Sequence, residues 1–176
     1  SDMYSAMATG IGTLKGPLHG GANIGVMKML EEIGDPSKAE AYVKDKLQRK
    51  EKVMGFGHRV YKAYDPRATY LKEFTRDLAE ETGRTKLFDI AVKVEEVMAK
   101  EVSHRGIHPN VDFYSAITFS CLGIEKDYFT PIFAISRIAG WAGHCIEQLR
   151  DNKLMRPRAH YIGPHDAKYV PMDQRK

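Results

Sequence analysis

Two glycine-rich loops in this sequence each carry one histidine in a setting that favours chemistry. Residues 16–23 read Gly-Pro-Leu-His-Gly-Gly-Ala-Asn and contain His19. Residues 55–61 read Gly-Phe-Gly-His-Arg-Val-Tyr and contain His58. Histidine can exchange protons or donate hydrogen bonds near neutral pH. Since functional side chains gather on loops that a rigid scaffold holds in place, we expect a site on these two loops.

The loop of His58 is followed by Asp65-Pro66 and then by Arg67. An Asp side chain can cap free backbone N–H groups and Pro fits the first helical position, so this pair predicts a helix start. Arg67 would then lie in the first turn of that helix, near His58. A proton donor beside a fixed cation suits an anionic substrate that has a carbonyl group. The alternative is a surface histidine in a tight glycine turn.

His19 and Asp112 both lie beside predicted helix N-termini. The helix dipole at His19 disfavours the protonated ring, and a neutral imidazole can donate a hydrogen bond to a developing enolate oxygen. The alternative is that His19 only caps its helix. Asp112 lies in the first turn of a helix that Asn110 can cap. Asp112 is therefore either a general base or a carboxylate that interacts with the helix dipole.

Further arginines follow in the C-terminal part of the chain. Arg137 lies in an apolar helical segment, where burial of a bare guanidinium is costly. Arg156 and Arg158 flank Pro157 after the last long helix. Arginine forks bind carboxylates through paired N–H groups. Three arginines converging with the two histidines would match a di- or tricarboxylate.

The elements that must position these residues are helices, because apolar residues recur at helical spacing and no sustained alternation indicates a strand. At most, residues 159–162 form a short extended piece. We predict an all-α fold with six or seven helices. The expected helices are 24–33 before Gly34, one from Asp35-Pro36 with Leu47 inward, one from Asp65-Pro66 with Leu71, Phe74 and Leu78 inward, 87–98, one from Asn110 to about Leu122, and the longest from Thr130-Pro131.

The composition excludes several classes of protein. A net charge of +4 with lysines interleaved among acids argues against nucleic-acid binding. The run at residues 49–52 is either a phosphate contact or a charged surface. No apolar run approaches the roughly 20 residues that span a bilayer, and no secretory signal is visible. Cys121 and Cys145, expected to be buried thiols, favour the cytoplasm, and no Cys/His spacing fits a metal site. The first residues suggest a piece of a longer chain.

Taken together, these segments resemble the C-terminal, catalytic half of citrate synthase in its bacterial and archaeal form. The resemblance covers nearly the whole chain and follows the order of the family's motifs at 16–23, 55–61, 65–68, 110–115, 136–137 and 156–158. It implies a multi-helical fold with a small domain inserted into a large one. The implied parts are a large-domain segment at 1–19, a small CoA-binding domain at 20–115, and a large-domain segment with a tail at 116–176. It also implies a homodimer with a shared active site and a missing N-terminal half.

The family condenses acetyl-CoA with oxaloacetate and hydrolyses the citryl thioester, with acetyl-CoA as a substrate and no metal or cofactor. By motif position, the resemblance implies that Asp112 removes a methyl proton, His19 stabilises the enolate and His58 polarises the oxaloacetate carbonyl. The carboxylates would be held by Arg67, Arg137 and Arg156, the last reaching the partner's site. The implied CoA contacts are Val53, Met54, Gly55, Phe56, Gly57 and Lys62.

Two alternatives remain open at the level of sequence. The 2-methylcitrate synthases share these motifs and use propionyl-CoA, and one methylene is worth only about 1–3 kcal/mol in a pocket. The chain could also be a non-catalytic helical piece that serves assembly, since the apolar face of residues 132–149 would pair across a dimer. If the two histidines, Asp112 and the arginines surround one cleft, the enzyme interpretation holds.

Overall fold

The computed structural model describes residues 1–16, 19–61 and 63–175. Within these ranges the chain forms seven α-helices and four 3₁₀ helices and no β-strand, so the all-α prediction is confirmed. The α-helices are α1 (Met3–Leu14), α2 (Ala22–Ile33), α3 (Ala39–Gln48), α4 (Pro66–Glu81), α5 (Thr85–Val102), α6 (Val111–Cys121) and α7 (Phe129–Arg150). The 3₁₀ helices are η1 (Pro36–Lys38), η2 (Ser103–Arg105), η3 (Lys126–Tyr128) and η4 (Met172–Gln174).

Local signals set most helix boundaries where the sequence predicts them. Asp65 caps α4 by accepting from the N–H of Arg67 at 3.0 Å, and Asn110 caps α6 by accepting from the N–H of Asp112 at 3.0 Å. Gly34 ends α2 in the left-handed region at φ 64°, which glycine adopts readily. The longest helix, α7, begins at Phe129, slightly before the predicted Thr130-Pro131, because η3 leads directly into it.

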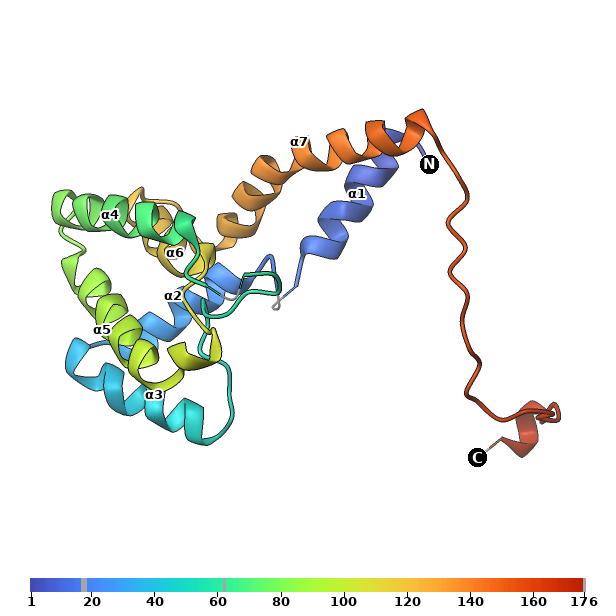
Figure 1. Cartoon of the computed structure of the whole chain (residues 1–176), viewed down its shortest axis with the longest axis horizontal. Helices are drawn as coiled ribbons and strands as arrows, with labels where there is room; N and C mark the ends of the chain where they lie inside the picture. Colours follow the sequence, from blue (N-terminus) through green and yellow to red (C-terminus); the bar gives the residue numbers. More distant parts are fainter. Residues whose placement is uncertain (17–18, 62, 176) are drawn as a thin grey trace.

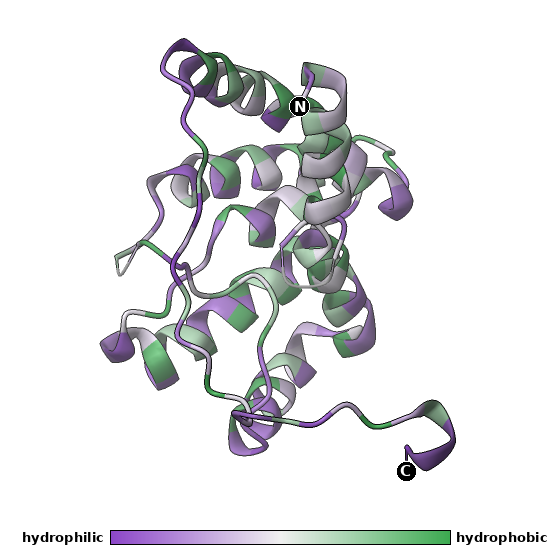
Figure 2. Ribbon diagram, turned by 90° about the vertical axis from the view of Figure 1, so that its right-hand side faces the viewer, coloured by the Kyte–Doolittle hydropathy of each residue, from purple (hydrophilic) through white to green (hydrophobic). Residues whose placement is uncertain are grey.

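One hydrophobic core joins the helices from α2 to α6. Its fully buried members include Val26 and Leu30 of α2, Ile90 of α5, and Phe113 and Ile117 of α6. Figure 1 shows these helices gathered on one side of the molecule, while α1 and α7 leave that body together and pack against each other. Each helix carries hydrophobic and hydrophilic residues in turn, as Figure 2 shows, so one face can pack while the other stays in water.

Two expectations about burial, for Phe74 and for Cys145, need correction. Phe74 points outward and is 63% exposed, because α4 buries its small residues Ala68, Thr75 and Ala79 instead. Cys121 is buried as expected, whereas Cys145 is only half-buried. The apolar side of α7 is largely exposed in this chain, with Ile135 at 72%.

The C-terminal segment after α7 extends away from the helical body, and the residues described there are almost all exposed (Figure 1). The expected extended piece at residues 159–162 lies in this segment and is not part of a strand. The division into domains at residues 19 and 115 stays a prediction. The buried core itself runs on past residue 115 through Cys121 to Phe129. None of the described helices is long and apolar enough to cross a membrane.

Candidate active site

Five of the six residues predicted for catalysis and for carboxylate binding line one cavity of about 460 Å³. They come from separate parts of the chain: the loop before α2, the loop before α4, the first turns of α4 and α6, and the middle of α7. A polar cavity with convergent histidines, cations and a carboxylate is a strong candidate for an active site. The five residues are His19, His58, Arg67, Asp112 and Arg137.

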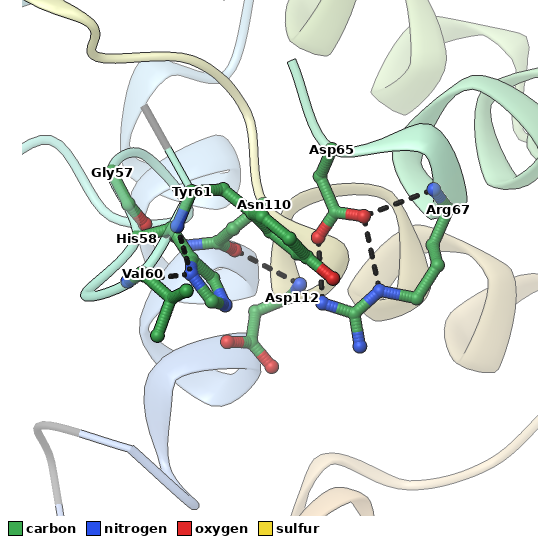
Figure 3. A network of polar contacts seen from close by, with 8 residues as sticks. All are labelled: Gly57, His58, Val60, Tyr61, Asp65, Arg67, Asn110 and Asp112. Carbon is green, nitrogen blue, oxygen red and sulfur yellow. Dashed lines mark hydrogen bonds and ion pairs between the residues drawn. The ribbon is translucent and has the colours of Figure 1, made fainter. Parts of the chain in front are cut away.

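Asp112 is the carboxylate at the centre of this group. It lies half-buried in the first turn of α6, and in Figure 3 its carboxylate lies between the imidazole of His58 and the guanidinium of Arg67. Burial raises the pKa of Asp112, while the charges of His19, Arg67 and His58 act in the opposite direction. A raised pKa makes the ionised carboxylate a stronger base. Asp112 therefore has the environment of a general base.

His58 is oriented by its own loop. Its Nδ1 accepts hydrogen bonds from the N–H groups of Val60 at 3.0 Å and Tyr61 at 2.9 Å (Figure 3). Since Nδ1 is an acceptor, the neutral ring carries its proton on Nε2. The ring of Tyr61 stacks on the imidazole, with 4.5 Å between centroids. The loop thus presents His58 as an N–H donor in a fixed orientation.

Arg67 is held by Asp65, the residue that caps its helix. The Nε and Nη2 atoms of Arg67 donate to the two carboxylate oxygens at 3.0 and 2.7 Å. Asp65 is only 2% exposed, and the hydrogen bonds from Arg67 are the main reason why its pKa lies below the usual range. The guanidinium also lies over the ring of Tyr61, at 5.9 Å from its centroid. Arg67 is therefore a cation of fixed position at the cavity wall.

A second pairing ties the His58 loop to the loop before α6. Asn110 Nδ2 donates to the carbonyl of Gly57 at 2.9 Å, and the N–H of Asn110 donates to the carbonyl of Gly55 at 2.9 Å. The N–H of Gly57 in turn donates to the carbonyl of His108 at 2.9 Å. These bonds fix the relative positions of the His58 loop and the Asp112 turn.

His19 and Arg137 also line the cavity, and both contact Phe133. The His19 ring meets Phe133 edge-on at 5.2 Å, and the Arg137 guanidinium lies 5.2 Å from the centroid of the same ring. The side chain of Thr130 donates to the carbonyl of Gly20 at 2.6 Å, which connects the His19 loop to the start of α7. Arg137 is exposed on α7, so its guanidinium avoids the cost of burial in this apolar segment.

An adjoining cavity of about 380 Å³ contains the predicted CoA contacts that the structure describes. It shares Gly57, Asn110 and Asp112 with the first cavity, so the two spaces meet at the carboxylate. Lys52 and Arg105 also line it. Lys62, a further predicted contact, lies outside the described residues. The predicted contacts in this cavity are Val53, Met54, Gly55, Phe56 and Gly57.

Arg156 does not line either cavity in the single chain. It lies in the exposed segment after α7, beyond the helical body. Its role in a carboxylate site stays a prediction, and that prediction assigns it to the partner subunit. Among the described residues, no group of three or more His, Cys, Asp or Glu side chains is placed to hold a metal ion.

No role was predicted for several residues that shape the cavity, although Arg59 and Tyr61 lie within the motif at residues 55–61. The ring of Tyr61 contacts His58 and Arg67, and the ring of Phe133 contacts His19 and Arg137. Arg59 contributes a further cation to the cavity wall. Asn110 was expected only as a helix cap, although its amide also holds the His58 loop. For Phe133, the available signal was its position one helical turn before Arg137 on α7.

Comparison with known proteins agrees with this geometry. Residues 1–158 match the family described as "Citrate synthase, C-terminal domain". The chain therefore belongs to the citrate synthase family. "Citrate synthase 2" of Bacillus subtilis is 53% identical over 175 residues, which is 99% of this chain and 46% of that protein. The citrate synthase of Deinococcus radiodurans is 51% identical over 176 residues, covering 100% of this chain and 47% of that protein.

Solved structures of citrate synthases have the same fold. One from Thermotoga maritima superposes with a TM-score of 0.88 at 49% identity, covering 100% of this chain and 48% of that one. The ternary complex of carboxymethyl coenzyme A and oxaloacetate with the Thermoplasma acidophilum enzyme gives a TM-score of 0.92 at 41% identity, covering 99% and 47%. This chain spans less than half the length of each of these proteins.

Proposed function

We propose that this chain is the catalytic C-terminal half of an enzyme that condenses acetyl-CoA with oxaloacetate to give citrate and CoA. The observation that carries the proposal is the cavity that joins His19, His58 and Asp112 with Arg67 and Arg137. Its adjoining cavity, which residues 53–57 line together with Lys52 and Arg105, supports a thioester substrate that meets the keto acid at Asp112. The solved relative bound to a CoA analogue and oxaloacetate supports the same pair of substrates.

The keto diacid would be held by charge and oriented by hydrogen bonding. Arg67 and Arg137 supply two cations to the cavity wall, which suits two carboxylates. His58 presents its Nε2–H, which would donate to the keto oxygen and draw electron density away from the carbon to be attacked. Fixed orientation of the two substrates supplies much of the rate increase in such reactions.

The carbon nucleophile would come from the acetyl methyl group. Asp112 takes one methyl proton, and His19 stabilises the resulting enolate by donating a hydrogen bond to the thioester oxygen. The methyl carbon then forms a bond to the keto carbon, whose oxygen takes up a proton, and water hydrolyses the citryl thioester to release CoA. The methyl group is a far weaker acid than any carboxylic acid, so base and oxygen-side donor must act together. These steps use only side chains, substrates and water, so we propose no metal or cofactor.

The proposed assembly is a homodimer that also contains the N-terminal half of the enzyme. The exposed apolar face of α7, with Ile135, Ile138, Ile146 and Leu149, supports a helix-mediated interface. We keep Arg156 as a carboxylate ligand for the partner's site, which its position on an extended segment allows. The two free cysteines fit a reducing cytoplasm.

The decisive experiment measures CoA release from acetyl-CoA and from propionyl-CoA with oxaloacetate. It should be run on the chain alone and on a fusion protein that joins it to the part of the Bacillus subtilis relative outside the match. We expect oxaloacetate-dependent release by the fusion protein and little by the chain alone. A clear preference for propionyl-CoA would change the product to 2-methylcitrate. A fusion protein that folds and binds neither substrate would refute the proposal and leave an assembly role.

A further inference from the structure

Glu95 is a largely buried carboxylate that lines neither cavity. It lies on α5 next to the buried Val94, and its side chain is 12% exposed. A carboxylate in this position is costly unless other groups satisfy it. Burial would raise the pKa of Glu95, but hydrogen bonds from three side chains outweigh burial and lower it, so the group is ionised at neutral pH. The three donors are Lys72, Tyr114 and Tyr64.

The contact with Tyr64 connects Glu95 to the active-site loop. The hydroxyl of Tyr64 donates to Oε1 of Glu95 at 2.7 Å. Tyr64 directly precedes Asp65, the residue that holds Arg67 at the cavity. A shift of Tyr64 would therefore shift the Asp65–Arg67 pair through one peptide unit.

Tyr64 also contacts the segment that holds the beginning of the same loop. Its ring lies 6.2 Å from the ring of His108, centroid to centroid. The carbonyl of His108 accepts the hydrogen bond from the N–H of Gly57, one residue before His58. Tyr64 thus braces both ends of the loop that carries His58.

The other two donors lie on the helices that carry the remaining cavity residues. Lys72 of α4 donates to Oε2 of Glu95 at 2.6 Å, and it follows Arg67 on the same helix. Tyr114 of α6 also donates to Oε2, and it lies two residues after Asp112. One carboxylate on α5 therefore connects α4, α6 and the His58 loop.

We propose that Glu95 and Tyr64 are positioning residues that hold the His58 loop and Arg67 in place for a keto diacid. Neither residue lines the cavity of the candidate site. This inference rests on the proposed function, because its consequence is the affinity for oxaloacetate.

The test compares two variants, each of which removes one tyrosine hydroxyl group that donates a hydrogen bond to Glu95. In the fusion protein, Tyr64→Phe should raise the KM for oxaloacetate about tenfold, with kcat changed less than about threefold, because the loop loses its anchor. Tyr114→Phe is the matched control: its side chain is fully buried on α6, so it should lower the melting temperature and leave this KM within about twofold. Glu95→Gln, which keeps the shape and loses the charge, should raise the KM as Tyr64→Phe does.

A second measurement does not depend on turnover. The amide N–H groups of Val60 and Tyr61 donate to His58 Nδ1, so their hydrogen exchange reports the order of the loop. Exchange should accelerate in Tyr64→Phe and stay unchanged in Tyr114→Phe. Equal effects of the two variants, or unchanged KM and exchange in Tyr64→Phe, would overturn the positioning role. If the unsubstituted fusion protein shows no turnover, the proposed function fails, and the exchange result alone decides the role of Tyr64.

Discussion

Asp65 grips Arg67 through both carboxylate oxygens, at 3.0 Å to Nε and 2.7 Å to Nη2, and leaves Nη1 outside the pair. The same Asp65 oxygen that accepts from Nε also caps α4 through the N–H of Arg67. Helix start and cation position are therefore set by one buried side chain. Arg67 is half-exposed, so its remaining N–H groups stay available to a substrate carboxylate.

Arg67→Leu should weaken oxaloacetate binding at least about tenfold and destabilise the fold by about 1–3 kcal/mol at pH 7, because Asp65 would be buried without its partner. The Arg67 contact lowers the pKa of Asp65. The stability it contributes is therefore present above the unfolded-state pKa and is lost as pH falls through the folded-state value. The difference in the free energy of unfolding between Arg67→Leu and the parent protein should accordingly become smaller in acid. Urea denaturation at several pH values would measure it.

Arg137→Leu is the control for Arg67→Leu. Arg137 lies over Phe133, and within the described residues it forms no ion pair with a carboxylate. This variant should also lose oxaloacetate affinity, but it should keep its stability. Equal destabilisation in both variants would contradict the role assigned to Asp65.

Asp112→Asn should lower kcat by about 10²–10⁴-fold, the usual contribution of a general base, and leave oxaloacetate affinity nearly unchanged. Loss of exchange of the acetyl-CoA methyl protons with deuterated solvent would locate the defect at proton removal. Weakened binding with normal turnover would refute the assignment.

The same Asp112→Asn substitution should stabilise the protein at neutral pH. Burial raises the pKa of Asp112 in the folded state, so folding favours the protonated form. The charged carboxylate therefore lowers the free energy of unfolding. This loss of stability begins as pH rises past the unfolded-state pKa and is complete above the folded-state pKa. The gain in melting temperature should therefore vanish in strong acid. An unchanged melting temperature at pH 7 would mean that the surrounding cations offset the burial.

Gly55→Ala and Gly57→Ala separate backbone strain from crowding. Both glycines lie in the left-handed region, at φ 82° and 86°. A Cβ on Gly55 would lie 2.7 Å from Cδ2 of Phe113 and 2.8 Å from Cγ2 of Val26, whereas nothing lies within 4 Å of one on Gly57. Gly57→Ala should cost about 1–2 kcal/mol of strain, and Gly55→Ala clearly more. Equal losses in chemical denaturation would contradict close packing at Gly55.

Ile135→Lys should weaken self-association without unfolding the chain. Ile135 is 72% exposed, so a lysine there removes apolar surface from a proposed interface at little cost to the monomer. Sedimentation equilibrium of the fusion protein would show a shift toward the smaller species. A dimer of unchanged affinity would place the interface elsewhere.

The sequence predicted the helices well because their signals are local. Asp65-Pro66, Asn110 and Gly34 act within one turn of the chain, and all three mark real boundaries. The helical spacing of apolar residues wrongly predicted that Phe74 points inward, because α4 packs closely on α6 and buries small residues at that contact. It also predicted apolar residues along α7 without showing that this chain leaves them exposed.

The sequence identified the individual residues of the candidate site, but it could not show how they are arranged in space. Asp65 was expected only as a helix cap, because an ion pair with Arg67 two residues later depends on side-chain geometry. The convergence of His19 and Arg137 depends on how α7 packs beside the His19 loop, as the bond from Thr130 to Gly20 shows. Such long-range contacts have no periodic signal in a single sequence.

The two hydrogen bonds from the backbone to His58 Nδ1 let the main chain determine the tautomer of the ring. The donors are the N–H groups of the second and third residues after the histidine, so the tautomer depends on the backbone of the loop and not on a neighbouring side chain. Proline has no N–H, so Val60→Pro would remove one of these two bonds while every side chain that lines the cavity stays the same. A ring that loses both bonds can carry its proton on Nδ1, and Nε2 then offers the cavity an acceptor instead of a donor.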